Sequence, residues 1–457
     1  MVAKTSRLGV PSRALLALLL LSVLGAGCRS AGETPRPNVV LISIDTLRPD
    51  HLGAYGYERA TSPHIDALAA SGVLFENALS PSSWTLPAHA SLLSGSSPYR
   101  HGAVAATARI RDDVPLLAEL LRAAGYRTAA FVNAPFVGRN YGFARGFERF
   151  EQRYERKRRD VAERHRQVLE GVAGLEPPFF LFVHYMDVHT PYRPPKEFNR
   201  FARDRRSSAV LKDIGEKSVL ELQRAARAGR LRVSDADRDR LVDLYDGEIL
   251  AIDAKIGELL DELRERFPGT IVILTSDHGE EFLEHGGLGH GETLYEEVLR
   301  VPLIVAGDGV ASGARIDTMV SLLDVVPTVL DRVGVVPPAT LDGRSLRAAL
   351  RAGRDASDAG TGGAGATLGL HTASHDGTLS LRGVRAPARK LLRDDRSGTV
   401  ELYDLRSDRG EHRNLAPAAH DERLERALAA LGTAEPSVAA PAPDAETVEA
   451  LKALGYL

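Results

Sequence analysis

Five near-continuous apolar runs, each the length of one β-strand, constrain the fold of this chain more than any other feature. They are NVVLISID (38–45), TAAFV (128–132), FFLFVHY (179–185), TIVILTSD (270–277) and VPLIVAG (301–307). Runs without polar alternation are typical of a parallel sheet buried on both faces. Segments with helical spacing, such as SPHIDALAASG and DVPLLAELLRAAG, lie between them and end at a glycine. The pattern predicts an α/β fold with a mostly parallel central sheet flanked by helices.

The segments between and after these runs predict the domain organisation. Arg, Asp and Glu at helical spacing dominate residues 153–246, which we interpret as a helical insertion beside the sheet. The glycine-rich run DAGTGGAGATLG then marks a boundary. We expect a catalytic domain at 37–358 and a smaller C-terminal α+β subdomain at 367–457, whose sequence alternates like a small antiparallel sheet.

The first 28 residues have the order of a secretory signal peptide. Lys4, Arg7 and Arg13 precede the apolar run ALLALLLLSVLGAG, which ends at Cys28 and is short for a transmembrane span. Cys28 is the only cysteine, so no intramolecular disulfide forms. LGAGC resembles the bacterial lipobox, which predicts a lipid anchor at Cys28 and a polar linker at 29–36. Plain secretion and an uncleaved anchor are the alternatives, and each predicts a periplasmic or cell-surface protein.

Acidic residues end two of the predicted strands. LISID delivers Asp45, and VILTSDHG delivers Asp277 and His278. In open α/β sheets, ligands bind at the carboxyl ends of the strands. A single Asp there is usually a turn or cap residue, but two such strands and an adjacent imidazole favour a divalent metal site, because clustered carboxylates need a cation. Ligand type alone permits Zn, Mn, Mg or Ca.

A hydroxyl and several loop histidines extend this candidate site. In SPSSWTLPAHASLLSG (80–95), Thr85 stands at the start of a predicted helix, where N–H groups favour an anion and metal coordination would deprotonate a hydroxyl. The alternative is that Thr85 is only an N-cap. Asp187 and His189 follow the Phe179 run, and His290 lies in a glycine-rich loop before the Val301 run.

Seven segments together resemble the sulfatase family of the alkaline phosphatase superfamily. They are PNVVLISIDTLRPDHLGAYGY, SPHIDALAASGVLFENALS, TLPAHASLLSG, HYMDVHTPY, TSDHGEEFLEHG, LYEEVLRVPLIV and ELYDLRSDRGEHRNLA, in the family's order. The resemblance spans residues 37–457. It implies that Asp45, Asp277 and His278 bind the metal, with Thr85 at the position of the family nucleophile.

The resemblance also assigns the histidines. His189 matches the acid that protonates the leaving oxygen, and His290 lies near the anion-binding lysine. His89 replaces the arginine of the family's Cys/Ser-x-Pro-x-Arg motif and is expected to orient Thr85. A second metal held by Asp187, His189 and His290 stays open, with Asp187 as a further metal ligand.

Two departures from the family pattern change the expected chemistry. Thr85 replaces the Cys or Ser that becomes formylglycine, and threonine nucleophiles in the superfamily act on phosphodiesters, phosphonates and phospholipid head groups. Thr46 replaces a second metal-binding Asp, and His278 stands where calcium sulfatases often have Asn. These changes favour Zn or Mn over Ca.

We therefore expect an exported, metal-dependent hydrolase that cleaves a phosphodiester or phosphonate in preference to a sulfate ester. Its substrate is a small-molecule, lipid or glycan ester. The balanced net charge of −3 gives no reason to expect a nucleic acid partner. Two alternatives stay open: a transferase that passes a phospho group to a glycan or lipid acceptor, and a noncatalytic envelope protein.

Overall fold

A nine-stranded sheet forms the centre of the protein in the computed structural model, which describes residues 36–154, 158–201, 219–354, 367–373, 379–436 and 438–453. The strand order is β10-β2-β9-β6-β1-β5-β3-β4, with β11 beside β2. Their bounds are β1 Val39–Ile44, β2 Val73–Leu79, β3 Arg127–Val132, β4 Arg149–Gln152, β5 Phe179–Tyr185, β6 Ile271–Thr275, β9 Arg300–Ala306, β10 Ala314–Ile316 and β11 Val320–Ser321.

The five apolar runs form strands β1, β3, β5, β6 and β9, and the sheet is mostly parallel, as predicted. Strand β9 is the exception, because it runs antiparallel to both β2 and β6. It therefore begins at the edge of the sheet where β6 ends. The connection between them carries a two-stranded ribbon, β7 Glu281–Phe282 with β8 Leu288–Gly289, and the short helix α10 Glu296–Leu299.

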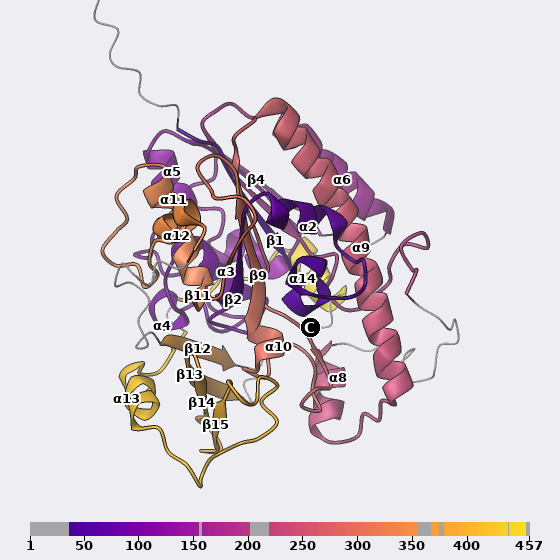
Figure 1. Cartoon of the computed structure of the whole chain (residues 1–457), viewed down its shortest axis with the longest axis vertical. Helices are drawn as coiled ribbons and strands as arrows, with labels where there is room; N and C mark the ends of the chain where they lie inside the picture. Colours follow the sequence, from indigo (N-terminus) through magenta and orange to yellow (C-terminus); the bar gives the residue numbers. More distant parts are fainter. Residues whose placement is uncertain are drawn as a thin grey trace, which may run out of the picture. The chain divides into compact units, whose positions relative to one another are not determined.

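Helices cover both faces of this sheet (Figure 1). Successive residues of β1 enter different apolar clusters: Val39 and Leu41 pack on one face, and Val40 and Ile42 on the other. The first face packs against α3 Thr85–Ser94, α5 Leu117–Ala123, α11 Val325–Arg332 and α12 Arg347–Ala352. The second packs against α2 Pro63–Ala70, α6 Arg158–Ala173, α8 Val219–Arg227 and α9 Asp235–Arg266.

The region predicted as a helical insertion contains α6, β5 and α8, and its last helix, α9, continues beyond residue 246 to Arg266. The continuation follows from the apolar spacing of α9, whose residues Ile249, Ile252 and Ile256 are fully buried against the sheet.

The C-terminal part forms an antiparallel sheet in the order β12-β13-β14-β15. Leu424 and Leu428 of α13 cover one face of this sheet, and Leu294 and Val298 from the region around α10 cover the other. All of this belongs to one compact unit, residues 37–457. The bounds are β12 Leu368–Ala373, β13 Ser380–Ala386, β14 Arg389–Asp394, β15 Val400–Asp404, α13 Glu422–Ala430, α14 Ala445–Ala453, and the short α4 Pro98–His101.

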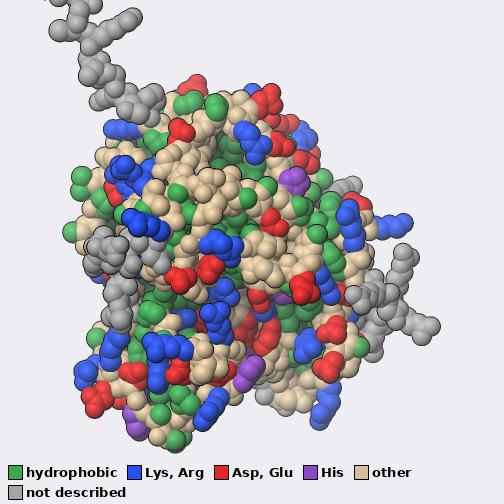
Figure 2. Space-filling view, viewed as in Figure 1, with side chains coloured by type: hydrophobic (Ala, Val, Ile, Leu, Met, Phe, Trp, Pro, Cys, Tyr) green, Lys and Arg blue, Asp and Glu red, His purple; other side chains and the backbone are tan. Residues whose placement is uncertain are grey.

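A buried lysine connects the C-terminal sheet to the α10 region. Lys390 of β14 has no exposed surface, and its Nζ lies 2.9 Å from Glu296 Oε1 and 2.6 Å from Glu411 Oε1. It also donates a hydrogen bond to the Leu294 carbonyl (2.8 Å). Figure 2 shows acidic side chains gathered over the region of α10. The C-terminal sheet therefore fixes the segment that follows His290.

No helix within the described ranges is long and apolar enough to cross a membrane. The predicted signal peptide at 1–28, almost all of the linker and residues 358–366 of the glycine-rich run lie outside the described residues.

Candidate active site and metal centre

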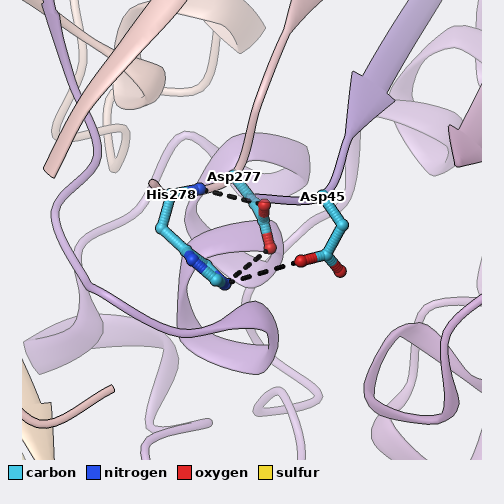
Figure 3. Close-up of side chains that lie close together, drawn as sticks. All are labelled: Asp45, Asp277 and His278. Atoms are coloured by element: carbon cyan, nitrogen blue, oxygen red, sulfur yellow. Dashed lines mark hydrogen bonds and ion pairs between the residues drawn. The ribbon is translucent and has the colours of Figure 1, made fainter. Parts of the chain in front are cut away.

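Two neighbouring strands bring Asp45, Asp277 and His278 together. Strands β1 and β6 pair in parallel, with Ser43 opposite Thr275, so the residues that follow both strands meet at one edge of the sheet. One potential ligand atom from each of the three side chains lies within 4.8 Å of the others (Figure 3). All three residues are fully buried. The sheet thus builds the cluster that the sequence predicted.

The donor atoms of this cluster fit a divalent cation. His278 Nε2 lies 3.2 Å from Asp277 Oδ2 and 3.8 Å from Asp45 Oδ1. Neither carboxylate oxygen of Asp45 accepts a hydrogen bond, and Asp277 Oδ2 accepts none either. Buried carboxylate oxygens without donors require a cation. His278 Nδ1 donates to the Gly279 carbonyl (2.9 Å), which leaves Nε2 free to bind a metal.

The pKa values of these groups respond to each other's charge. Burial opposes ionisation of Asp277, but His278 and His89 hold the pKa of Asp277 well below its ordinary value. Burial also opposes protonation of His278, yet Asp277 and Asp45 raise the pKa of His278 to about 9. Two buried carboxylates thus attract positive charge, which is the electrostatic condition for a metal site.

Thr85 places its hydroxyl beside this cluster. It is the first residue of α3, it is 3 % exposed, and its Oγ1 lies 3.4 Å from His278 Nε2. The first N–H groups of a helix have no intrahelical partner and carry partial positive charge, so an oxyanion at this point is stabilised. The described structure therefore brings the predicted nucleophile and the predicted metal ligands to one point.

His89 lies one helical turn further along α3 and supports Thr85 through the backbone. His89 Nδ1 donates to the Thr85 carbonyl (3.0 Å) and lies 3.3 Å from Asp277 Oδ2. The Ser43 hydroxyl is 3.0 Å from His89 Nε2. His89 is fully buried and contacts the carbonyl of Thr85, whereas the hydroxyl of Thr85 faces His278.

His189 and His290 form a row of rings with His278. The rings of His189 and His290 have centroids 4.9 Å apart, and those of His290 and His278 are 4.4 Å apart. Glu280 Oε1 lies 2.9 Å from His290 Nδ1, and both residues are buried. This acidic partner fixes the ring of His290 with Nε2 away from Glu280.

Asp187 is directed to a different partner. Its carboxylate forms an ion pair with Lys255 of α9, 68 residues away in the sequence. In the described ranges, the groups of three closely spaced metal-binding side chains are Asp45–Asp277–His278 and Glu281–His285–Glu297. Neither contains Asp187, His189 or His290, so the structure shows no second centre built from these three residues within those ranges.

The sequence reasoning overlooked His184 and Glu280. His184 is 2 % exposed, and its Nε2 lies 3.3 Å from Asp45 Oδ2. Burial lowers the pKa of His184. A histidine inside the apolar run FFLFVHY was a usable signal, because an imidazole in a buried strand needs a polar partner. Glu280 carried no comparable signal, since it stands in the acidic stretch GEEFLE.

Thr46 and Arg48 support the edge of the site. Thr46 has a φ of +57°, a strained conformation for a β-branched residue, and its N–H donates to Asp277 Oδ1 (3.3 Å). The Arg48 guanidinium pairs with Asp50 (2.7 Å) and Glu284 (2.6 Å).

The mostly parallel sheet with its flanking helices is the fold of solved sulfatases and of a phosphonate monoester hydrolase. Residues 37–335 match the sequence profile of the family described as sulfatase. Residues 284–431 match a second profile, described as N-sulphoglucosamine sulphohydrolase, C-terminal. The chain belongs to the sulfatase family. It is a hydrolase acting on sulfuric or phosphoric ester bonds.

Relatives of known name agree with this assignment. A Delta 4,5-hexuronate-2-O-sulfatase from Bacteroides thetaiotaomicron is 24% identical over 85% of this chain and 86% of that protein. A choline-sulfatase from Rhizobium meliloti is 28% identical over 68% of this chain and 71% of that protein. The structure of a phosphonate monoester hydrolase of Agrobacterium radiobacter superposes with a TM-score of 0.70 and 22% identity, covering 87% of this chain and 95% of that one.

Proposed function

We propose that this protein is an exported metal-dependent hydrolase that uses Thr85 as its nucleophile and prefers phosphodiesters or phosphonate esters to sulfate esters. The substrate is a small-molecule, lipid or glycan ester. One observation carries the proposal: the Thr85 hydroxyl lies 3.4 Å from His278 Nε2, beside three carboxylate oxygens that have no hydrogen-bond donor, both of Asp45 and Oδ2 of Asp277.

Asp45, Asp277 and His278 would hold the metal, and the mixed oxygen and nitrogen donors suit Zn or Mn. When bound, a divalent cation supplies positive charge that favours the ionised Thr85 hydroxyl and offsets charge on the ester oxygens. The N-terminus of α3 adds partial positive charge at the same oxygen.

The side chains of the protein then account for the bonds made and broken. The Thr85 oxygen, which has lost its proton to solvent, attacks phosphorus or sulfur, and the bond from that atom to the leaving oxygen breaks. His189 donates a proton to the leaving oxygen. His290, whose Nδ1–H donates to Glu280 (2.9 Å), donates from Nε2 to an equatorial oxygen of the ester when its ring is protonated beside the anionic substrate. Water then gives a proton to His189 and attacks phosphorus or sulfur; the bond from that atom to the Thr85 oxygen breaks, which releases the acid and restores both residues.

The preference for phosphorus follows from the side chain of residue 85. Threonine carries a methyl group on Cβ, so oxidation at that carbon gives a ketone and not an aldehyde. The hydrate of formylglycine is therefore not accessible to this chain. The fold itself does not decide between substrates, since solved structures of similar fold include sulfatases and phosphonate monoester hydrolases.

The experiment compares four esters after loading with Zn, Mn or Ca: a phosphodiester, a phosphomonoester, a phosphonate monoester and a sulfate ester. We expect the phosphodiester or the phosphonate to give the highest kcat/KM with Zn or Mn. A higher kcat/KM on the sulfate ester contradicts the proposed preference. An added acceptor alcohol that diverts product from hydrolysis identifies a transferase.

Export and lipid anchoring belong to the same proposal and rest on residues 1–28. Cell fractionation with the variant Cys28→Ser tests them. Loss of the variant from the membrane fraction, with wild-type protein retained there, supports lipidation at Cys28. Equal distribution of both proteins contradicts it.

A further inference from the structure

Strand β5 places His184 next to the metal ligand Asp45. Strands β1 and β5 pair in parallel, with Ser43 opposite His184, so both side chains lie on the same face of the sheet. On this face, Phe180 and Phe182 of β5 belong to the apolar core that contacts α3. The next residue of β5 on this face is His184. The backbone N–H of Asp45 donates a hydrogen bond to the carbonyl of the following residue, Tyr185 (2.8 Å), so Asp45 lies close to His184.

His184 is a buried polar group that the mechanism does not use. It is 2 % exposed, and neither ring nitrogen has a hydrogen-bond partner. A buried donor or acceptor without a partner costs about 1–3 kcal/mol, so such a group requires an explanation. Its Nε2 lies 3.3 Å from Asp45 Oδ2, which also lacks a donor.

The two oxygens of Asp45 face different imidazoles. Oδ1 lies 3.8 Å from His278 Nε2, on the side of Asp277, whereas Oδ2 lies beside His184. Figure 3 shows one oxygen of Asp45 directed at His278 and the other directed away. The ligand group within 4.8 Å in the described structure contains Asp45, Asp277 and His278 but not His184. Ligands of one Zn ion lie at most about 4 Å apart, so His184 stands outside the coordination sphere.

His89 holds His184 in this position. The two rings pack edge to face, with centroids 4.8 Å apart and an interplanar angle of 72°. His89 is itself fixed by Ser43 (3.0 Å), and it lies 3.3 Å from Asp277 Oδ2. Each metal-binding carboxylate thus has one imidazole beside it that is not a metal ligand: His184 beside Asp45, and His89 beside Asp277.

We infer that His184 is a positioning residue of the metal centre: its Nε2–H donates to Asp45 Oδ2 and turns Oδ1 toward the metal. Outer partners of metal ligands orient the ligand and raise metal affinity, and their loss costs about 10–100-fold in affinity. The inference rests on the metal centre of the proposed function and not on its substrate.

Two substitutions separate a positioning role from a ligand role. His184→Gln retains an N–H donor near the position of Nε2, whereas His184→Leu fills similar space without a donor. We expect the Leu variant to raise the Kd for Zn by about 10–100-fold and the Gln variant by less than about threefold. The matched controls are His101→Gln and His101→Leu, because His101 is also fully buried but bonds to Ser91 of α3 (3.1 Å) and not to a residue of the metal cluster.

Two spectroscopic readouts on the Zn-loaded protein keep the inference testable if His184→Leu does not fold. X-ray absorption should show the same number of imidazole ligands in wild type and His184→Gln. Long-range ¹H–¹⁵N spectra should show His184 as the neutral Nε2–H tautomer. An imidazole number that falls by one in His184→Gln, or an Nδ1–H tautomer, makes His184 a ligand and overturns the inference.

An unchanged Kd for Zn in a folded His184→Leu variant also overturns the inference, since His184 then has no role at the metal. Wild-type protein that binds no Zn also overturns it. Wild-type protein that binds Zn but hydrolyses no ester contradicts the proposed function alone, and the Kd values of the variants still decide the role of His184.

Discussion

Outside the active site, Lys390 should be among the positions where a substitution lowers the free energy of unfolding most, because its charge is buried. Lys390→Met preserves most of the side-chain volume but removes the charge that lies 2.9 Å from Glu296 and 2.6 Å from Glu411. In this variant Glu296 retains its ion pair with Arg385 (3.0 Å), whereas Glu411 loses its ion-pair partner. Breaking one partner of a buried ion pair costs about 3–5 kcal/mol, and we expect a loss of this size in the free energy of unfolding.

Urea unfolding measures this loss, followed by the fluorescence of Trp84, the only tryptophan and the neighbour of Thr85. The double variant Lys390→Met/Glu411→Gln should recover much of the loss, because it leaves no charge without a partner at Glu411. Lys452→Met is the control: Lys452 pairs with Glu449 on the surface, and we expect a change below about 1 kcal/mol. A loss below about 1 kcal/mol for Lys390→Met, or no recovery in the double variant, refutes the reasoning.

Three further predictions concern protons and the metal. Burial raises the pKa of Asp253 to about 6 from an ordinary 3.8, so wild type should lose about 2.4 kcal/mol of stability relative to Asp253→Asn as pH rises from 4 to 7; parallel pH–stability curves contradict this. Because Asp277 raises the pKa of His278 to about 9, Zn binding at pH 7 should release about one proton, seen by calorimetry in buffers of different ionisation enthalpy, and buffer-independent heats contradict this. His189→Gln should lower kcat by about 10²–10⁴ for esters with poor leaving groups and far less for 4-nitrophenyl esters; equal losses contradict a proton donor.

Much of the fold was readable from the sequence because local patterns encode it. The runs at β1, β3, β5, β6 and β9 have no polar alternation, and each forms a buried strand. The direction of β9 was not readable, because a parallel and an antiparallel neighbour of β6 require the same apolar residues. Strand β2 was also missed, since Glu76 and Asn77 interrupt its apolar residues at the point where the ladder with β9 is irregular.

The sequence predicted those residues of the candidate site whose positions depend only on where a strand ends. Asp45 and Asp277 follow paired strands, so their meeting required only the sheet. Asp187 shows the limit, because its partner Lys255 comes from a helix that the sequence does not place beside it. His184 shows a second limit: its role depends on which face of β5 meets α3, and that follows from packing.

The most direct test of the account is to find where the substrate's phosphoryl group is attached during turnover. A phosphodiester reaction of the Zn- or Mn-loaded protein is quenched in acid, and its peptides are analysed by mass spectrometry, with Thr85→Ala and Thr85→Ser run in parallel. The account predicts a phosphoryl ester on the peptide at Thr85, reduced turnover in Thr85→Ser, and no turnover in a folded Thr85→Ala variant. Retained turnover in Thr85→Ala, without any ester on this peptide, contradicts Thr85 as the nucleophile.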